Sequence, residues 1–123
     1  MELNLERPGE YLFVRRGDAH SVTVVDHVLT RSFVLARETL IEDWPVADVQ
    51  AIDEAQLAPI FALQPEVVLL GTGARQRFPA QAIVAAFLQR RVGVEVMDNA
   101  AASRTYNVLA SEGRHVVAAF ILE

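Results

Sequence analysis

The most constraining feature of this chain is a glycine loop that directly follows an apolar run of strand length. In the segment 66–70, all four residues after Glu66 are apolar, a pattern typical of a strand covered on both faces of a sheet. Gly71-Thr72-Gly73 then opens a loop that continues to Phe78. A buried strand ending in such a loop predicts an α/β fold in which this strand is the central one of the sheet.

Helix and strand signals alternate after the loop. Pro79 suits the first turn of a helix with an apolar stripe, and Gly93 marks its stop. A second helix is expected from Asp98, which can cap it, to Glu112, with Gly113 as its stop. The expected strands of this half are 66–70, 94–97 and 116–122. The C-terminal half therefore predicts the order strand, glycine loop, helix, strand, helix, strand.

The N-terminal third predicts an antiparallel β layer. Short β-branched and aromatic runs alternate there with turn signals such as Gly17-Asp18 and Asp26-His27. The expected extended segments are 11–14, 22–25, 28–30 and 32–36. Asp53 can cap a later helix that starts at Glu54, and Pro59 should kink or restart that helix.

Length, charge and missing residue types reduce the range of possible functions. A chain of 123 residues is the size of one domain, which we place at 1–123. The net charge of −5 disfavours nucleic acid as a partner. All eleven basic residues are Arg and Cys is absent, which excludes Schiff-base lysines, P-loop lysines and thiol nucleophiles. The acidic start resembles no targeting segment and no apolar run reaches ~20 residues, so we expect a cytoplasmic protein without membrane insertion.

The glycine loop permits two functional interpretations. A dinucleotide site would require a third glycine where Gln76 stands, so no cofactor is expected. The loop could instead hold an anion, because two glycines can turn backbone N–H groups toward it while Arg75 and Arg77 add donors. A tight surface loop with solvated arginines is the simpler interpretation.

The helix expected at 98–112 carries a polar stripe. Ser103, Asn107 and Ser111 recur at helical spacing beside Arg104, and we expect this stripe to face water. Asp98 and Thr105 lie nearer the buried side, where capping and core hydrogen bonds are the default role.

Other candidate sites are weaker. Glu112 and His115 have the spacing of a metal motif, but Gly113 interrupts the helix that the motif needs, so no metal site is expected. Trp44, beside two acidic residues in a connection between expected elements, could be a partner anchor, but we favour a lid over the edge of the core.

Three segments together resemble one known family. They are Leu-Leu-Gly-Thr-Gly at 69–73, Val-Glu-Val-Met-Asp at 94–98, and Ala-Ala-x-Arg-Thr-Tyr-Asn-Val-Leu-x-x-Glu-Gly-Arg at 101–114. They are similar to the Mth938-like domain of unknown function, a family that includes a mitochondrial complex I assembly factor. The resemblance implies a three-layer α/β domain with a central mixed sheet and no established catalytic activity. The sequence departs from the family at Asn99, where Thr is usual, and at Ser103, where Cys or an aliphatic residue is common.

Two functions stay open. The resemblance and the lack of a catalytic motif favour a non-enzymatic interaction or assembly-factor-like domain, with another protein or a second copy of the chain as partner. The alternative is a protein, or an enzyme, that binds a small molecule or an anion between the glycine loop and segment 98–107, where two strands deliver their carboxyl ends. A flat apolar patch with Trp44 or Phe residues exposed would favour a partner, and a concave pocket lined by Thr72, Arg75 and Asn107 would favour a ligand. The candidate ligand-binding residues are Gly71, Thr72, Gly73, Arg75, Asp98, Arg104, Thr105 and Asn107.

Overall fold

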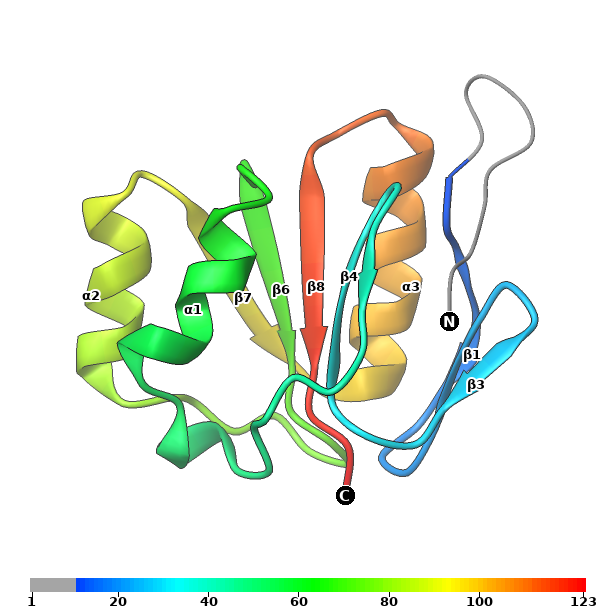
Figure 1. Cartoon of the computed structure of the whole chain (residues 1–123), viewed down its shortest axis with the longest axis horizontal. Helices are drawn as coiled ribbons and strands as arrows, with labels where there is room; N and C mark the ends of the chain where they lie inside the picture. Colours follow the sequence, from blue (N-terminus) through cyan, green and yellow to red (C-terminus); the bar gives the residue numbers. More distant parts are fainter. Residues whose placement is uncertain (1–10) are drawn as a thin grey trace.

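The computed structural model describes residues 11–123, and the expectation about the acidic start of the chain lies outside these residues. Its helical elements are η1 (Val49–Ala51), α1 (Glu54–Phe61), α2 (Gln81–Gln89) and α3 (Asn99–Ser111), labelled in Figure 1 except for η1. Its strands are β1 (Val14–Gly17), β2 (Val22–Val24), β3 (His27–Leu29), β4 (Phe33–Ala36), β5 (Leu40–Ile41), β6 (Val67–Gly71), β7 (Gly93–Met97) and β8 (Val116–Phe120).

The strands form two sheets. A small antiparallel sheet has the order β1-β2-β3, and the main sheet has the order β5-β4-β8-β6-β7. The main sheet is mixed, because β6 runs parallel to β7 and β8 while β4 runs antiparallel to β5 and β8. The predicted α/β class with a central mixed sheet is therefore confirmed.

Two details of the predicted topology are wrong. The strand at 32–36 does not belong to the N-terminal layer, because β4 pairs with β8 inside the main sheet. The strand after Pro65 is not the central one, because β8 takes that place and β6 lies between β8 and β7. Local patterns report burial but not the identity of a distant strand partner, so they could not have predicted either pairing.

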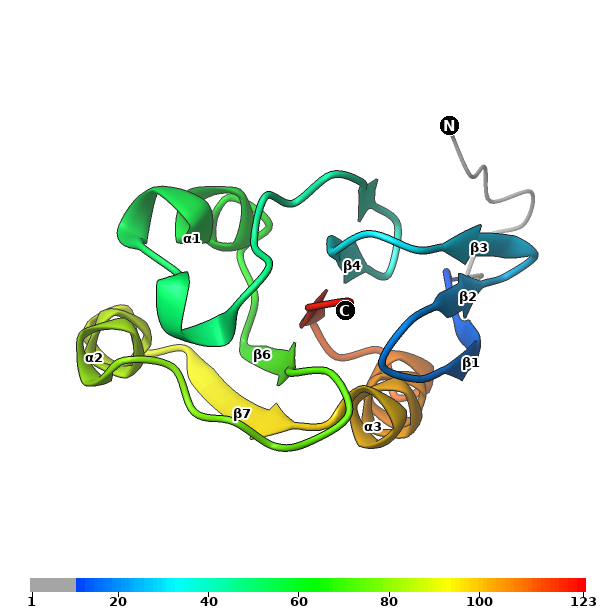
Figure 2. The ribbon, with the colours of Figure 1, turned by 90° about the horizontal axis from the view of Figure 1, so that it is seen from below.

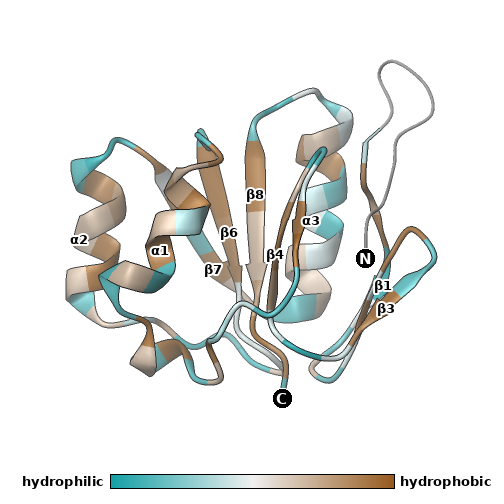
Figure 3. Ribbon diagram, in the orientation of Figure 1, coloured by the Kyte–Doolittle hydropathy of each residue, from teal (hydrophilic) through white to brown (hydrophobic). Residues whose placement is uncertain are grey.

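The main sheet separates two hydrophobic cores (Figure 2). On one face α1, α2 and the segment around Trp44 pack against alternating residues such as Val68 and Leu70. On the other face α3 and the small sheet pack against Leu69 and its neighbours. Figure 3 shows the central strands as the most apolar part of this three-layer arrangement.

Several element boundaries differ from prediction. β1 begins at Val14, three residues late, and α2 begins at Gln81, because Pro79 and the extended Ala80 precede it. The left-handed residue that ends α2 is Arg91, with φ +58°, while Gly93 already belongs to β7. β5 and η1 were not predicted.

Two predicted helix termini and the predicted position of Trp44 are confirmed. Asp53 caps α1 in a reciprocal capping box with Gln56, and Gly113, with φ +77°, terminates α3. Pro59 lies inside α1, which continues through it to Phe61 rather than restarting. Trp44 is 3% exposed and its Nε1 donates to the Gln56 carbonyl at 2.9 Å, so it is a lid over the core.

No helix within residues 11–123 is long and apolar enough to cross a membrane.

Candidate functional site

The loop after β6 and the start of α3 are neighbours, as expected for the carboxyl ends of adjacent parallel strands. Gly71 is paired with Met97 at the ends of β6 and β7. Gly73 and Asn99 then exchange hydrogen bonds: the Asn99 N–H donates to the Gly73 carbonyl at 2.9 Å, and the Gly73 N–H donates to Asn99 Oδ1 at 3.1 Å. The structure therefore brings the glycine loop and the start of α3 together.

Asn99 is the central polar residue of this junction. Its side chain is fully buried, and its Nδ2 donates to the carbonyls of Asp18 and Ile121, both at 3.0 Å. One amide thus joins the glycine loop, the small sheet and the end of β8. This role was not predicted, because nothing in the local sequence shows which distant carbonyls Asn99 meets.

Gly71 and Gly73 are each required for a different structural reason. A Cβ on Gly71 would lie 2.5 Å from Asn99 Oδ1 and 3.1 Å from the Phe120 ring, so this position needs the absence of a side chain. Gly73 has φ +91°, a conformation that L residues rarely adopt. The loop is built for close approach to Asn99 and for a sharp turn.

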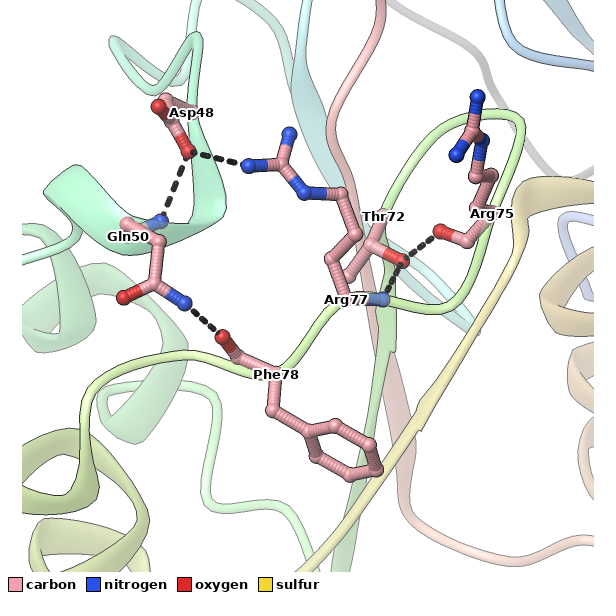
Figure 4. A network of polar contacts seen from close by, with 6 residues as sticks. All are labelled: Asp48, Gln50, Thr72, Arg75, Arg77 and Phe78. Atoms are coloured by element: carbon pink, nitrogen blue, oxygen red, sulfur yellow. Dashed lines mark hydrogen bonds and ion pairs between the residues drawn. The ribbon is translucent and has the colours of Figure 1, made fainter.

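Thr72 organises the rest of the loop (Figure 4). The residue is 5% exposed, its hydroxyl donates to the Arg75 carbonyl at 2.5 Å, and the Arg77 N–H donates to that hydroxyl at 3.0 Å. The Thr72 N–H donates to the Met97 carbonyl at 2.9 Å. The N–H groups of Thr72, Gly73 and Arg77 are therefore bonded inside the protein.

The two arginines of the loop do not converge. Figure 4 shows the Arg77 side chain extending toward Asp48, with 3.9 Å between Nη2 and Oδ1, while the Arg75 side chain extends away from it. Both are exposed, and the Arg75 guanidinium forms no hydrogen bond or ion pair within residues 11–123. Gln50, on η1, donates its side-chain N–H to the Phe78 carbonyl and holds the end of the loop.

The candidate residues of α3 point to different places. Asp98 accepts from the Ala101 N–H at 2.8 Å and caps the helix, as predicted. Asn107 forms two hydrogen bonds with the backbone of Val14. Thr105 is half-buried, and Arg104 is exposed without a side-chain hydrogen bond or ion pair among the described residues. Asp98 and Asn107 thus serve the helix cap and the small sheet.

The expectation that the polar stripe of α3 faces water is wrong for two of its residues. Ser103 is 5% exposed and its hydroxyl donates to the Asn99 carbonyl at 2.8 Å. Asn107 is half-buried against β1. The small sheet covers this side of α3, and helical periodicity alone cannot show that a second layer packs there. Ser111 is exposed, as expected.

Tyr106, Asp18 and Glu66 are among the side chains whose pKa values are shifted. Burial raises the pKa of the Tyr106 phenol, whose hydroxyl donates to the Leu12 carbonyl at 2.6 Å. The backbone N–H groups of His20 and Ser21 lower the pKa of Asp18. The N–H of His115, and then the Arg114 guanidinium, lower the pKa of Glu66. Each shift accompanies a structural hydrogen bond.

Two surface pockets lie away from the glycine loop. A pocket of about 220 Å³ lies where β4 ends and β8 begins, and Arg37, Leu63 and His115 are among its lining residues. A second, of about 260 Å³, lies between the ends of α1 and α2. Within residues 11–123, no three His, Asp or Glu side chains gather closely enough to hold a metal ion. Neither pocket is lined by a residue of the candidate ligand site.

Known proteins resemble this chain over most of its length. A family model described as protein of unknown function (DUF498/DUF598) matches residues 14–121. The solved structure of Xanthomonas campestris XCC1710 is 46% identical, with a TM-score of 0.85, and the match covers 99% of this chain and 92% of that one. A Bordetella pertussis protein described as a Mth938-like domain is 30% identical with a TM-score of 0.77, over 98% of this chain and 92% of that one.

Curated relatives are longer than the matched region. The NADH dehydrogenase [ubiquinone] 1 alpha subcomplex assembly factor 3 of Bos taurus is 38% identical over 80 residues, which are 63% of this chain and 44% of that protein. The 13 kDa major membrane protein of Francisella tularensis is 35% identical over 71 residues, 58% of each chain. The match therefore spans about half the length of these relatives.

Proposed function

This chain belongs to the DUF498/DUF598 family of proteins of unknown function, as its resemblance to Mth938-like domains predicted, and on that premise we propose that it is a protein-binding domain. The binding surface in this proposal is the outer surface of α2, which consists of Ala82, Ala85 and Leu88.

The observation that carries the proposal is an apolar helix at the periphery of the molecule. Residues 82–88 contain no polar side chain, and Figure 3 shows polar colour on α2 only near its ends. The inner side of α2 packs Ile83 and Phe87 into the core, yet Leu88 is 67% exposed. A helix that is apolar on all sides is ordinarily buried. We therefore infer that another molecule covers the outer surface of α2.

The polar residues of α3 and of its N-cap support the same proposal. Asp98, Asn99, Tyr106 and Asn107 use their polar atoms to cap α3 or to join it to other layers, and the Ser103 hydroxyl donates to the Asn99 carbonyl within α3. A reactive site keeps polar groups directed at a substrate. These side chains instead hold the domain together, which suits a rigid scaffold that presents a surface.

The relationship to complex I assembly factors points in the same direction. The bovine relative is named as an assembly factor for a multisubunit enzyme, and 63% of this chain matches it. Assembly requires contact between proteins, so we extend protein binding, but no particular partner, to this chain. The alternative of a ligand at the glycine loop stays a prediction that the loop's internal hydrogen bonds make less favourable.

Affinity capture from cells that express the chain natively tests the proposal. Leu88→Ser removes the largest exposed apolar side chain of α2 and should leave the fold intact, because that side chain is 67% exposed. Val108→Ser is the matched control, since Val108 is 56% exposed on α3 across the sheet. We expect a reproducible set of captured proteins that Leu88→Ser loses and Val108→Ser keeps. Equal capture by both variants, or no capture by the unmodified chain, would contradict the proposal.

A further inference from the structure

We infer that the free edge of β7 is a latent pairing site for a second copy of this chain, and that Gln76 and Glu95 keep this edge closed. The inference goes beyond the proposed function, because it concerns a different surface from the outer side of α2. Two observations carry it: a hydrogen bond from Gln76 to the edge, and the charge that Glu95 places at the middle of β7.

β7 has one edge without a neighbouring strand, because it is the last strand of the main sheet and pairs with β6 alone. The Gly93 N–H bonds to the residue before β6 at 3.1 Å, and the Met97 carbonyl bonds to the residue after β6 at 2.9 Å. Since the direction of the backbone groups alternates along a strand, those of Val94 and Val96 point away from the sheet. A row of such groups is a template for another strand.

The sequence of β7 suits this kind of pairing. Residues 92–97 read Val-Gly-Val-Glu-Val-Met, a run rich in β-branched residues with one charged side chain. The other edge of the same sheet is β5, which has only two residues, so β7 is the longer free edge. Natural sheets protect an edge of this kind by covering it or by placing a charge on it. β7 has both kinds of protection.

Gln76 covers the edge from the glycine loop. Its Nε2 donates to the Val96 carbonyl at 2.8 Å, and this carbonyl is one of the groups that point away from the sheet. Figure 2 shows the segment between β6 and α2 passing along β7 on the side away from β6. The Thr72 hydroxyl holds the backbone of the residues on both sides of Gln76. The amide of Asn107 closes the free edge of β1 in the same way, through its hydrogen bonds to Val14.

Glu95 places a charge at the middle of the edge. Its side chain is exposed and forms no ion pair within residues 11–123. Two copies of β7 that pair antiparallel about a two-fold axis form the most hydrogen bonds when each Val94 faces the Val96 of the other copy. In that register Glu95 lies directly opposite its own counterpart, and like charges so placed destabilise the pair. The same register needs the Val96 carbonyl to which Gln76 donates.

Other registers of the antiparallel pair offer fewer hydrogen bonds. A pair centred on Val94 would next require the backbone of Val92, whose N–H already donates to the Phe87 carbonyl at 3.0 Å. A pair centred on Val96 would next require Asp98, where the chain leaves the strand and caps α3. Gln76 and Glu95 therefore act on the register that is best able to hold two copies together.

Removing both protections tests the inference. Sedimentation velocity on the full chain should show that Gln76→Ala with Glu95→Thr forms dimers, with a dissociation constant roughly tenfold or more below that of either single variant. Gln76→Ala with Glu112→Thr is the matched control, because it removes an equal charge from an exposed position at the end of α3. This control should associate no more than Gln76→Ala alone, and thermal unfolding checks that each variant folds.

Amide hydrogen exchange shows whether β7 is the contact. The N–H groups of Val94 and Val96 form no hydrogen bond within residues 11–123, so their exchange should slow only in the dimer of Gln76→Ala with Glu95→Thr. A folded double variant that stays monomeric would overturn the inference. So would association that leaves the exchange of these two amides unchanged, or equal association of the control.

A charge exchange tests the register. One variant carries Gln76→Ala and keeps Glu95, and the other carries Gln76→Ala with Glu95→Lys. Each alone should associate no more than the unmodified chain, because like charges are opposed, whereas an equimolar mixture should form dimers that contain one copy of each. High salt should weaken these dimers, since screening reduces the attraction. A mixture that associates no more than its components, while both variants fold, would overturn the proposed register.

Discussion

The side-chain amide of Asn107 forms two hydrogen bonds with the backbone of Val14, across 93 positions of sequence. The Val14 N–H donates to Oδ1 at 2.8 Å, and Nδ2 donates to the Val14 carbonyl at 2.7 Å. β1 pairs with β2 on one side only, so its other edge would present unpaired backbone groups. The amide of Asn107 takes the place of a neighbouring strand there and attaches α3 to the small sheet.

Replacing Asn107 with Ala should lower the free energy of unfolding by about 2 kcal/mol, because two hydrogen bonds are lost and the N–H of buried Val14 has no replacement. Urea denaturation of the variant and the unmodified chain measures the difference. Arg104→Ala, on the exposed side of the same helix, is the control and should change stability by less than about 0.5 kcal/mol. Equal effects of the two substitutions would show that the amide does not hold β1.

Glu66 predicts a pH-dependent contribution to stability. The His115 N–H donates to its Oε1 at 2.9 Å and Arg114 lies 3.6 Å away, and these contacts lower the pKa of Glu66 below its ordinary 4.5. A carboxyl group whose pKa is lower in the folded state stabilises the fold above the unfolded pKa, and this contribution is lost as the pH falls through the folded pKa.

Glu66→Gln keeps a side-chain acceptor but removes the charge. We therefore expect the variant to be less stable than the unmodified chain near neutral pH, and the difference to shrink as the pH falls below about 4.5. Denaturation curves at a series of pH values measure it. A difference that stays constant with pH would mean that the carboxylate charge contributes nothing at this position.

The glycine loop should not respond to anions. The N–H groups of Thr72, Gly73 and Arg77 already donate to Met97, Asn99 and the Thr72 hydroxyl, so an anion would have to displace internal bonds. We expect titration with phosphate or sulfate to leave the amide NMR signals of these three residues unchanged up to millimolar concentrations. A saturable shift confined to residues 71–77 would instead support the ligand-binding alternative.

Local signals in the sequence were sufficient to predict much of the secondary structure of the C-terminal half. Asp98 as a cap, Gly113 as a stop and the buried run of β6 all follow from neighbours within a few residues, and the structure confirms them. Arg91 shows the limit even there, because it takes the left-handed conformation for which Gly93 was the better candidate by type.

Long-range partners could not be predicted. β4 pairs with β8, with Phe33 stacked on Phe120 at 5.0 Å between ring centroids, and no local pattern specifies that pairing. Asn99 likewise depends on carbonyls at positions 18 and 121. The outer surface of α2 was missed for a different reason. An apolar helix predicts burial, and only the arrangement in space shows that one side of α2 has no covering layer among the described residues.

Gly71 should tolerate no side chain, although its backbone conformation would allow one. Its φ is not in the left-handed region, so Ala is excluded by contact alone: the added Cβ would lie 2.5 Å from Asn99 Oδ1 and 3.1 Å from the Phe120 ring. Asn99 cannot retreat without breaking its hydrogen bonds to three segments. We expect Gly71→Ala to cost about 3 kcal/mol or more of the free energy of unfolding.

Gly93→Ala is the matched control, because Gly93 lies at the start of the neighbouring strand β7, also without a left-handed φ. The nearest atom to its added Cβ would be the Glu66 carbonyl oxygen at 3.7 Å, an ordinary contact, and the residue is exposed. Ala there should be neutral or slightly stabilising, since it reduces the freedom of the unfolded chain. Thermal and urea unfolding of the two variants measure the contrast. If both substitutions were tolerated equally, Asn99 would be free to move, and the junction between the glycine loop and α3 would be less rigid than its hydrogen bonds indicate.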